Sequence, residues 1–257
     1  MKNLRNNASL LDNMLHKTPR KQDQAQCVLN KATLTVLTLL ALVVAPNIVL
    51  AKPLSSDAAT IAELTILSGG DRMPGLIYIA AGKGPHPTAV FLHGYPGNER
   101  SLDVAQAARA AGWNAVYFNY RGAWGAEGEF SFMNAEADVQ STLKYLSDPD
   151  NATRLRIDPK QLSLVGHSLG GHMSVAGMLD NENVRCAVAY DGVNIGAWAV
   201  SDTLWSDYSD TLFMLKDWSG AKSISEVDAH RAKFDLVPRL KSLGERHLLI
   251  LAADTQV

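Results

Sequence analysis

The stretch Gly166-His167-Ser168-Leu169-Gly170 decides the fold. It follows a short apolar run at residues 161–165 and precedes a helical stretch, so it fits the G-x-S-x-G pattern that places a serine on a sharp turn between a strand and a helix. Such a serine adopts a strained backbone conformation, and its hydroxyl then projects above the edge of the sheet. Gly166 and Gly170 leave room where the strand and the helix pass closely. The pattern predicts Ser168 as a nucleophile.

Two backbone amides are candidate donors to a negatively charged oxygen beside this serine. The N–H of Leu169 lies in the first turn of the expected helix, where amides have no partner within the helix and the dipole favours negative charge. A second loop, His93-Gly94-Tyr95, follows an earlier strand. We assign the second donor to the N–H of Tyr95, because Pro96 has none. Tyr95 and Leu169 are thus the predicted oxyanion hole, and His93 is expected to be structural.

Outward from this turn, apolar runs alternate with amphipathic helical stretches. This alternation is typical of an α/β fold in which a mostly parallel sheet carries helices on both faces. The two opening strands are joined by a turn and are expected to form an antiparallel edge. The strands are expected at residues 60–67, 75–80, 88–92, 115–118, 161–165, 185–190 and 247–252, and the helices at 100–111, at 134–147 and from 168 onward.

The pattern changes between residues 192 and 240, where tryptophans, Phe213 and Met214 lie among many Asp and Ser residues. Long excursions between strands often form lids or substrate-binding walls. We therefore expect a lid or an insertion at 192–240, while a set of packing helices with an aromatic core is an equal alternative.

The N-terminus has the layout of a signal peptide. Basic residues precede a largely apolar run of thirteen residues, Ala32 to Val44, and Val49-Leu50-Ala51 suits a cut after Ala51. A membrane anchor is the alternative, but the run is shorter than the roughly 20 residues that span a bilayer. We expect residues 1–51 to be a signal peptide and 52–257 a single domain that is secreted or periplasmic, with no stable membrane insertion after cleavage.

Charge and cysteine content exclude several classes of function. Removal of residues 1–51 leaves 18 basic and 24 acidic side chains, a net charge of −6, so no basic surface suits nucleic acid. The predicted domain keeps one cysteine, Cys186, which is expected to be a small buried hydrophobe. No Cys/His cluster has the spacing of metal ligands, and neither a metal nor a cofactor is expected.

Three motifs carry a family resemblance. His93-Gly94-Tyr95-Pro96-Gly97, Asn119-Tyr120-Arg121-Gly122 and the run from Ile157 to Gly171 resemble α/β-hydrolases of the prolyl-oligopeptidase and dienelactone-hydrolase-like esterase kind, and the likeness extends from about Ala62 onward. This resemblance implies a Ser, Asp, His triad in that order. Asp254, in Asp254-Thr255-Gln256-Val257, resembles the D-x-x-V of the family and is the implied acid.

The sequence departs from the family pattern at the histidine, because no histidine follows Asp254. We expect a truncated fold that lacks the last strand and helix. Of the histidines present, His230 is the one in a region that could approach Ser168, and we regard it as an unconventional alternative.

The resemblance implies a serine hydrolase that cleaves a carboxylic ester or an amide through an acyl-enzyme on Ser168. Two alternatives stay open. The chain could be a catalytically silent truncated hydrolase that acts at most as a binding protein, or a peptidase for small peptides. The expected partner is a small-molecule ester or a short peptide.

Overall fold

The structure is a computed structural model, and it describes residues 57–197 and 203–252. The predicted signal peptide at 1–51 and the predicted acid Asp254 lie outside the described residues.

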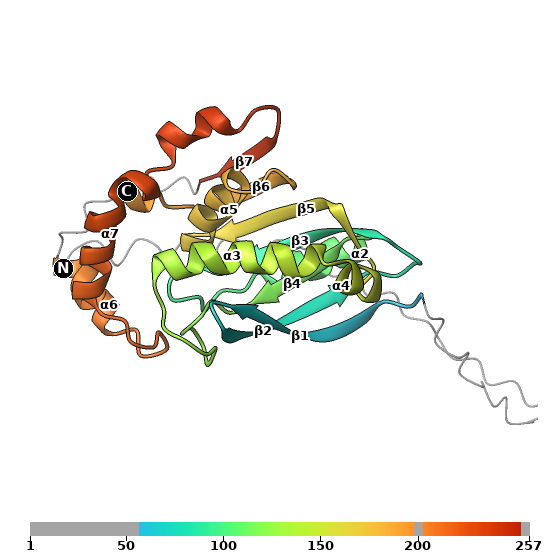
Figure 1. Cartoon of the computed structure of the whole chain (residues 1–257), viewed down its shortest axis with the longest axis horizontal. Coiled ribbons are helices and arrows are strands. Elements are labelled where there is room, and N and C mark those ends of the chain that lie inside the picture. The colour runs from blue at the N-terminus through green and yellow to red at the C-terminus, as the bar shows by residue number, and fades with distance from the viewer. Residues whose placement is uncertain (1–56, 198–202, 253–257) are drawn as a thin grey trace, which may run out of the picture. The chain divides into compact units, whose positions relative to one another are not determined.

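Seven strands form one mixed sheet (Figure 1). Its order is β1-β2-β4-β3-β5-β6-β7. The β1–β2 and β2–β4 pairs are antiparallel, while β4, β3, β5, β6 and β7 pair in parallel. The expected antiparallel edge and the parallel remainder are both confirmed. The strands are β1 (Thr60–Ser68), β2 (Asp71–Ile79), β3 (His86–Leu92), β4 (Asn114–Phe118), β5 (Ile157–His167), β6 (Val184–Tyr190) and β7 (His247–Leu251).

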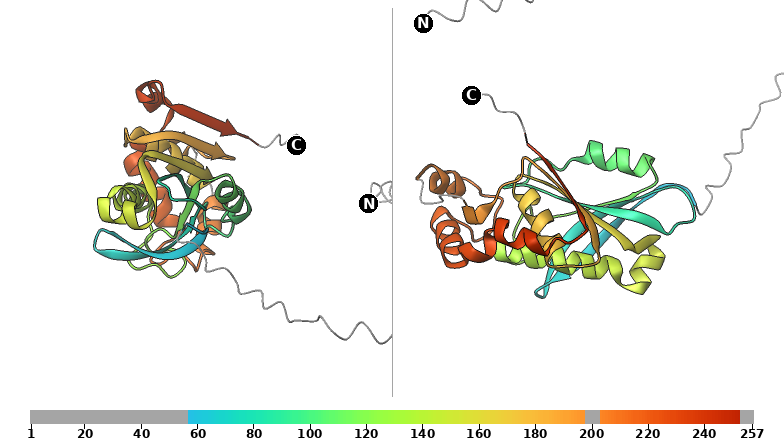
Figure 2. Two further views of the ribbon diagram at one scale, coloured as in Figure 1. Left: turned by 90° about the vertical axis from the view of Figure 1, so that its right-hand side faces the viewer. Right: turned by 90° about the horizontal axis from the view of Figure 1, so that it is seen from above.

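Helices cover both faces of this sheet, as the alternating pattern predicts. The sheet separates α2 from α3 and α5 (Figure 2). The helices are α2 (Leu102–Ala110), α3 (Phe132–Ser147), α4 (Pro149–Arg154), α5 (Leu169–Leu179), α6 (Thr203–Asp210) and α7 (Gly220–Phe234), with short 3₁₀ helices η1 (Ile195–Ala197) and η2 (Val237–Ser242).

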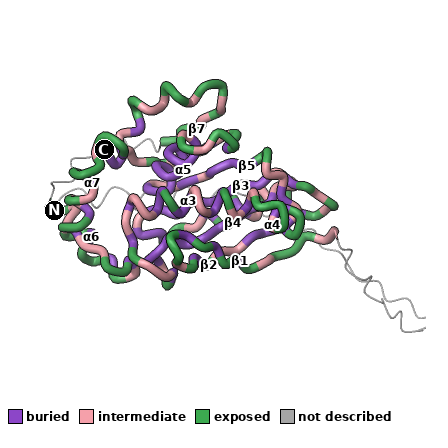
Figure 3. Tube along the Cα trace, in the orientation of Figure 1, coloured by how far each residue is buried: buried purple, intermediate pink, exposed green. Residues whose placement is uncertain are grey.

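The core lies on the two faces of the central strands. Along β3, Val90 and Leu92 belong to the large cluster that includes α3 and α5 residues, while Phe91 belongs to a smaller cluster with Ala105 of α2. This alternation explains why the strand reads as a continuous apolar run, since both of its faces are buried. Helix α5 is buried along almost its whole length, as the purple trace in Figure 3 shows. It therefore holds Ser168, at its N-terminal end, in a fixed place.

The short helix α4 is the main element that the sequence analysis missed. Helix α3 does end at Ser147, as expected. No helix was expected directly after residue 147, yet the Asp148 carboxylate accepts the N–H groups of Asp150 and Asn151 and begins a new helix. A proline in the first turn is compatible with a helix start, because its missing N–H would have no helical partner.

The 192–240 region contains α6 and α7, each partly packed against the remainder of the fold. Val227 and Phe234 of α7 are fully buried, whereas Phe213 in the connection is 91% exposed. The alternative expectation of packing helices with an aromatic core is therefore confirmed for Phe234 but not for Phe213. None of the helices in the described part of the chain is long and apolar enough to span a membrane.

Strand β7 lies at the edge of the sheet and pairs with β6 alone among the described strands. Leu249, Ile250 and Leu251 are each at least half exposed. A strand at 247–252 was expected, and the structure confirms it within one residue.

Candidate active site

The turn at Ser168 has the geometry that the sequence pattern requires. Ser168 joins β5 to α5 with φ +53° and ψ −114°, a strained backbone conformation for a residue with a side chain. A Cβ at position 166 would lie 1.8 Å from the carbonyl oxygen of Gly170, and a Cβ at position 170 would lie 1.9 Å from that of Leu92. Both positions therefore require glycine.

The loop after β3 lies directly against this turn. A Cβ at Gly94 would lie 3.2 Å from the Cβ of Ser168 and 3.3 Å from the carbonyl oxygen of His167, closer than ordinary van der Waals contact, so a glycine here eases the approach of the loop to the turn. Tyr95 and Leu169 line the same cavity as Ser168. In the described part of the chain, the N–H of Tyr95 donates to no other residue. The structure thus brings the three predicted residues together, and the roles of the two amides stay a prediction.

His93 ties the β3 loop to the loop after β4. Its Nδ1 donates to the carbonyl oxygen of Gly94 at 2.9 Å, and the N–H of Tyr120 donates to its Nε2 at 3.5 Å. Complete burial lowers the pKa of His93 to about 4. The ring is neutral at pH 7 and holds a proton on Nδ1, which agrees with the structural role that the sequence analysis expected.

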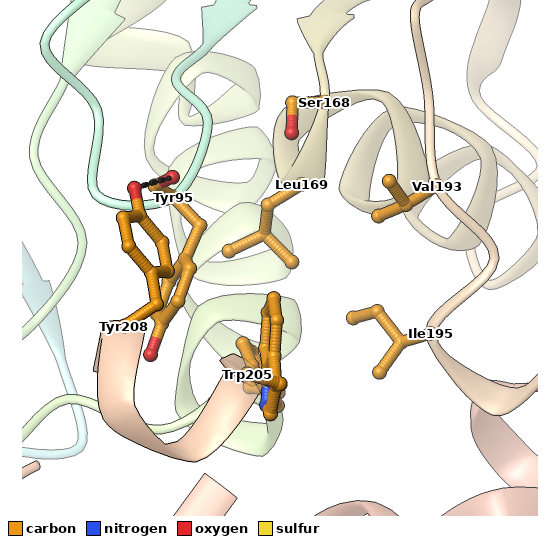
Figure 4. A pocket seen from close by; sticks show the side chains of 8 residues that line it. Tyr95, Ser168, Leu169, Val193, Ile195, Trp205 and Tyr208 are labelled. Carbon is orange, nitrogen blue, oxygen red and sulfur yellow. Dashed lines mark hydrogen bonds between the residues drawn. The ribbon is translucent and has the colours of Figure 1, made fainter. Parts of the chain in front are cut away.

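An apolar cavity of about 200 Å³ opens beside Ser168 (Figure 4). No charged side chain is among its described lining residues. The Ser168 hydroxyl points into it from one end. The lining consists of Tyr95, Phe132, Ser168, Leu169, Val193, Ile195, Trp205 and Tyr208.

Sequence reasoning missed most of the residues that shape this cavity. Trp205 and Tyr208 come from α6, and Val193 comes from the segment after β6. The unusual aromatic content of residues 192–240 indicated a substrate-binding wall in general terms. No local pattern could select Trp205 from the other aromatic residues, because the selection depends on how α6 packs.

None of the described histidines lines the cavity. His172 is buried on α5, with its Nε2 3.5 Å from a Glu136 carboxylate oxygen and its Nδ1 accepting the N–H of Ile195. His167 stacks on Tyr190. His230 is exposed on α7 and lines a different hollow, so it does not reach Ser168 in this structure.

The described residues include no group of three or more His, Cys, Asp or Glu side chains that could hold a metal ion. Cys186 was expected to be a small buried hydrophobe; it is partly buried, and its Sγ lies 3.0 Å from the Ser163 hydroxyl.

Comparison with known proteins supports the fold. The family model described as BD-FAE matches residues 77–202. A search of curated proteins found no match. Among solved structures, 2,6-dihydroxy-pseudo-oxynicotine hydrolase is 20% identical with a TM-score of 0.55, over 76% of this chain and 53% of that one.

Two esterases are similar to the same extent. The Pyrobaculum calidifontis esterase is 20% identical with a TM-score of 0.53, over 74% of this chain and 65% of that one. EstE1, a thermostable carboxylesterase cloned from a metagenomic library, is 15% identical with a TM-score of 0.53, over 76% of this chain and 79% of that one. The chain thus spans 53% to 65% of the first two hydrolases. Together with the sheet order, these likenesses show that the chain has the α/β-hydrolase fold.

Proposed function

We propose that this protein is a hydrolase in which Ser168 attacks the carbonyl carbon of a carboxylic ester, or of an amide, and forms an acyl-enzyme. One observation carries the proposal: Ser168 is held at φ +53° at the N-terminus of α5, with its hydroxyl directed into an apolar cavity. A strained, cavity-facing serine at a helix N-terminus suits nucleophilic catalysis.

The proposed reaction has two halves. Attack by the Ser168 oxygen forms a tetrahedral intermediate, whose negative oxygen is stabilised by the N–H groups of Leu169 and Tyr95. Collapse of this intermediate breaks the bond to the leaving group, which departs with the proton lost by Ser168 as an alcohol (or as an amine from an amide), and leaves the acyl group on Ser168. Water then attacks the acyl-enzyme, and the same two amides stabilise the second intermediate.

None of the described histidines lines the cavity, so we propose none of them as the general base for Ser168. Removal of the histidine from a serine triad slows turnover by on the order of 10⁶-fold, and the oxyanion hole and substrate binding account for what remains. We therefore expect slow ester hydrolysis by the 257-residue chain. Asp254 as the orienting acid remains a proposal.

The apolar cavity beside Ser168, with no histidine among its described lining residues, also fits a second candidate: a protein that binds small apolar ligands without hydrolysing them. A peptidase for short peptides is less favoured, because peptide termini are charged and the described lining of the cavity offers no charged partner.

A fluorophosphonate probe tests the nucleophile. We expect slow labelling of the wild-type chain, located at Ser168 by mass spectrometry of its peptides, and no labelling of Ser168→Ala at the same exposure. Ser174→Ala is the matched control, since Ser174 lies on the same helix and its hydroxyl donates to backbone oxygens. Equal labelling of Ser168→Ala would mean that another residue is the nucleophile.

A further inference from the structure

We propose that Trp205 of α6 forms the floor of the Ser168 cavity and restricts the enzyme to esters of short, uncharged acyl groups. This inference rests on the proposed function, because it assigns the cavity to the acyl part of the substrate.

The position of Trp205 opposite the nucleophile is the first observation. In Figure 4, Ser168 lies at one end of the cavity and the indole of Trp205 at the other. Leu169 lies between them, and Val193 and Ile195 lie on the right-hand side of the view. An acyl chain bonded to the Ser168 oxygen and extending into the cavity therefore meets the indole at its far end.

The indole is held in place from two sides. Its ring stacks on Tyr95 with centroids 5.2 Å apart and an angle of 21° between the planes. Its Nε1 donates to the hydroxyl of Ser223 at 3.0 Å, and that fully buried hydroxyl donates in turn to the carbonyl oxygen of Gly220. Since α7 carries both of these residues, the floor is a fixed boundary rather than a loose side chain.

The size of the cavity sets the length of the acyl group. Its volume of about 200 Å³ is below the roughly 300 to 1,000 Å³ of sites that hold drug-sized ligands. An apolar cavity of about 150 Å³ is known to accommodate a benzene-sized molecule. The cavity therefore suits an acyl chain of about four to six carbons and not one of eight.

The lining of the cavity disfavours charged acyl groups as well as long ones. The described side chains that line the cavity are apolar or carry a hydroxyl or an indole N–H. Burial raises the pKa of Tyr95 to about 12, so its phenol stays neutral. A carboxylate at the end of the acyl chain would lose its hydration without gaining a cationic partner. We expect neutral acyl groups to be preferred for this reason.

Alkyl trifluoromethyl ketones provide a test that needs no turnover. They mimic the ester carbonyl and form a hemiketal with a reactive serine, so their dissociation constants, measured by titration calorimetry, report on both Ser168 and the cavity. The series uses butyl, hexyl and octyl chains, and a hexyl analogue that ends in a carboxylate. The proteins are the wild-type chain, Trp205→Ala, Trp205→Phe and Phe213→Ala. Phe213→Ala is the matched control, because this aromatic residue is 91% exposed.

The wild-type chain should bind the butyl and hexyl ketones more tightly than the octyl ketone, and the carboxylate analogue at least tenfold more weakly than its neutral counterpart. Each buried methylene improves binding by about fourfold. Trp205→Ala should therefore increase the affinity for the octyl ketone, relative to that for the butyl ketone, by at least tenfold. Trp205→Phe should increase it by a smaller factor. Phe213→Ala should keep the wild-type profile.

The inference is overturned if the ratio of the octyl to the butyl dissociation constant is the same in Trp205→Ala as in the wild-type chain, provided that thermal melting shows that the variant is folded. If that variant does not fold, an unchanged ratio in Trp205→Phe has the same meaning. Equal binding of the carboxylate and neutral ketones overturns the charge preference.

Ser168→Ala separates this inference from the proposed function, because it should weaken the binding of every ketone by a similar factor. If Ser168→Ala weakens the binding of no ketone, Ser168 is not the nucleophile. The ratios of the octyl to the butyl dissociation constants still test the role of Trp205 in that case.

Discussion

At the scale of single residues, the serine turn depends on backbone atoms that approach one another closely. Gly166 lies against the backbone of α5, and Gly170 lies against the end of β3. In both cases the obstructing atom is a backbone oxygen, which cannot move aside as a flexible side chain can. The turn therefore has no tolerance for a methyl group at these two positions.

Replacement of Gly170 by alanine should lower the free energy of unfolding by about 3 kcal/mol or more, because overpacking against rigid backbone is costly. Gly112→Ala is the control: its φ is +90° but no atom lies within 4 Å of the added Cβ. That change should cost about 1 to 2 kcal/mol, from backbone strain alone. Urea unfolding of both variants measures the difference. An equal loss of unfolding free energy in the two variants would contradict the close approach of Gly170 to the end of β3.

Sequence analysis could predict this turn because its signal is local. Five consecutive residues, with glycines at both ends and a strand before them, define Ser168 and the N–H of Leu169. Trp205 lies 37 positions further along the chain and reaches the cavity only through the packing of α6. No spacing rule connects it to Ser168, so the floor of the cavity could not be predicted.

At the scale of secondary-structure elements, one imidazole joins the ends of two neighbouring strands. His93 follows β3, and Tyr120, whose N–H it accepts, follows β4. Since the next residue after His93 is the glycine that contacts the Ser168 turn, this contact stabilises the loop that carries the predicted oxyanion donor Tyr95.

Burial lowers the pKa of His93 to about 4 from 6.5, so the unfolded chain binds a proton at a higher pH than the folded protein. The stabilising effect of the neutral ring is complete above pH 6.5 and decreases as the pH falls toward 4. Between pH 7 and pH 4.5 the wild-type protein should lose roughly 2 to 3 kcal/mol more stability than His93→Asn. Urea midpoints at the two pH values provide the measurement, and equal pH dependence in both proteins would contradict it.

The strands and long helices were predictable because their patterns of apolar residues are regular. The expected strand at 115–118 and helix at 134–147 differ from β4 and α3 by one or two residues at their N-terminal ends. By contrast, α4 has only six residues, too few to show a helical period, so no helix was predicted there. Short helices depend on capping, and the same cap residues also form turns.

At the scale of the whole molecule, the α/β-hydrolase sheet brings residues from three distant parts of the chain to one cavity. Ser168 and Leu169 follow β5, Tyr95 follows β3, and Trp205 belongs to α6. The carboxyl ends of parallel strands meet at one edge of the sheet, which is where ligands bind in such folds. The sheet order thus explains the location of the site.

We propose that this domain acts outside the cytoplasm, after cleavage following Ala51. The basic flank, the apolar run at residues 32–44 and Val49-Leu50-Ala51 motivate this proposal. When the full chain is expressed in a bacterial host, N-terminal sequencing of the exported protein should begin at Lys52. A membrane-bound product that keeps residues 32–44 would instead indicate an anchor.

The central claim is that Ser168 is positioned for nucleophilic attack once a base takes up its proton, and added imidazole tests this claim most directly. Hydrolysis of p-nitrophenyl butyrate by the 257-residue chain is measured with increasing imidazole, after subtraction of the reaction of imidazole alone. We predict slow hydrolysis without imidazole, an increase with imidazole of at least tenfold, and no increase in Ser168→Ala. Ordinary esterase turnover without imidazole, or the same increase in Ser168→Ala, would contradict the account.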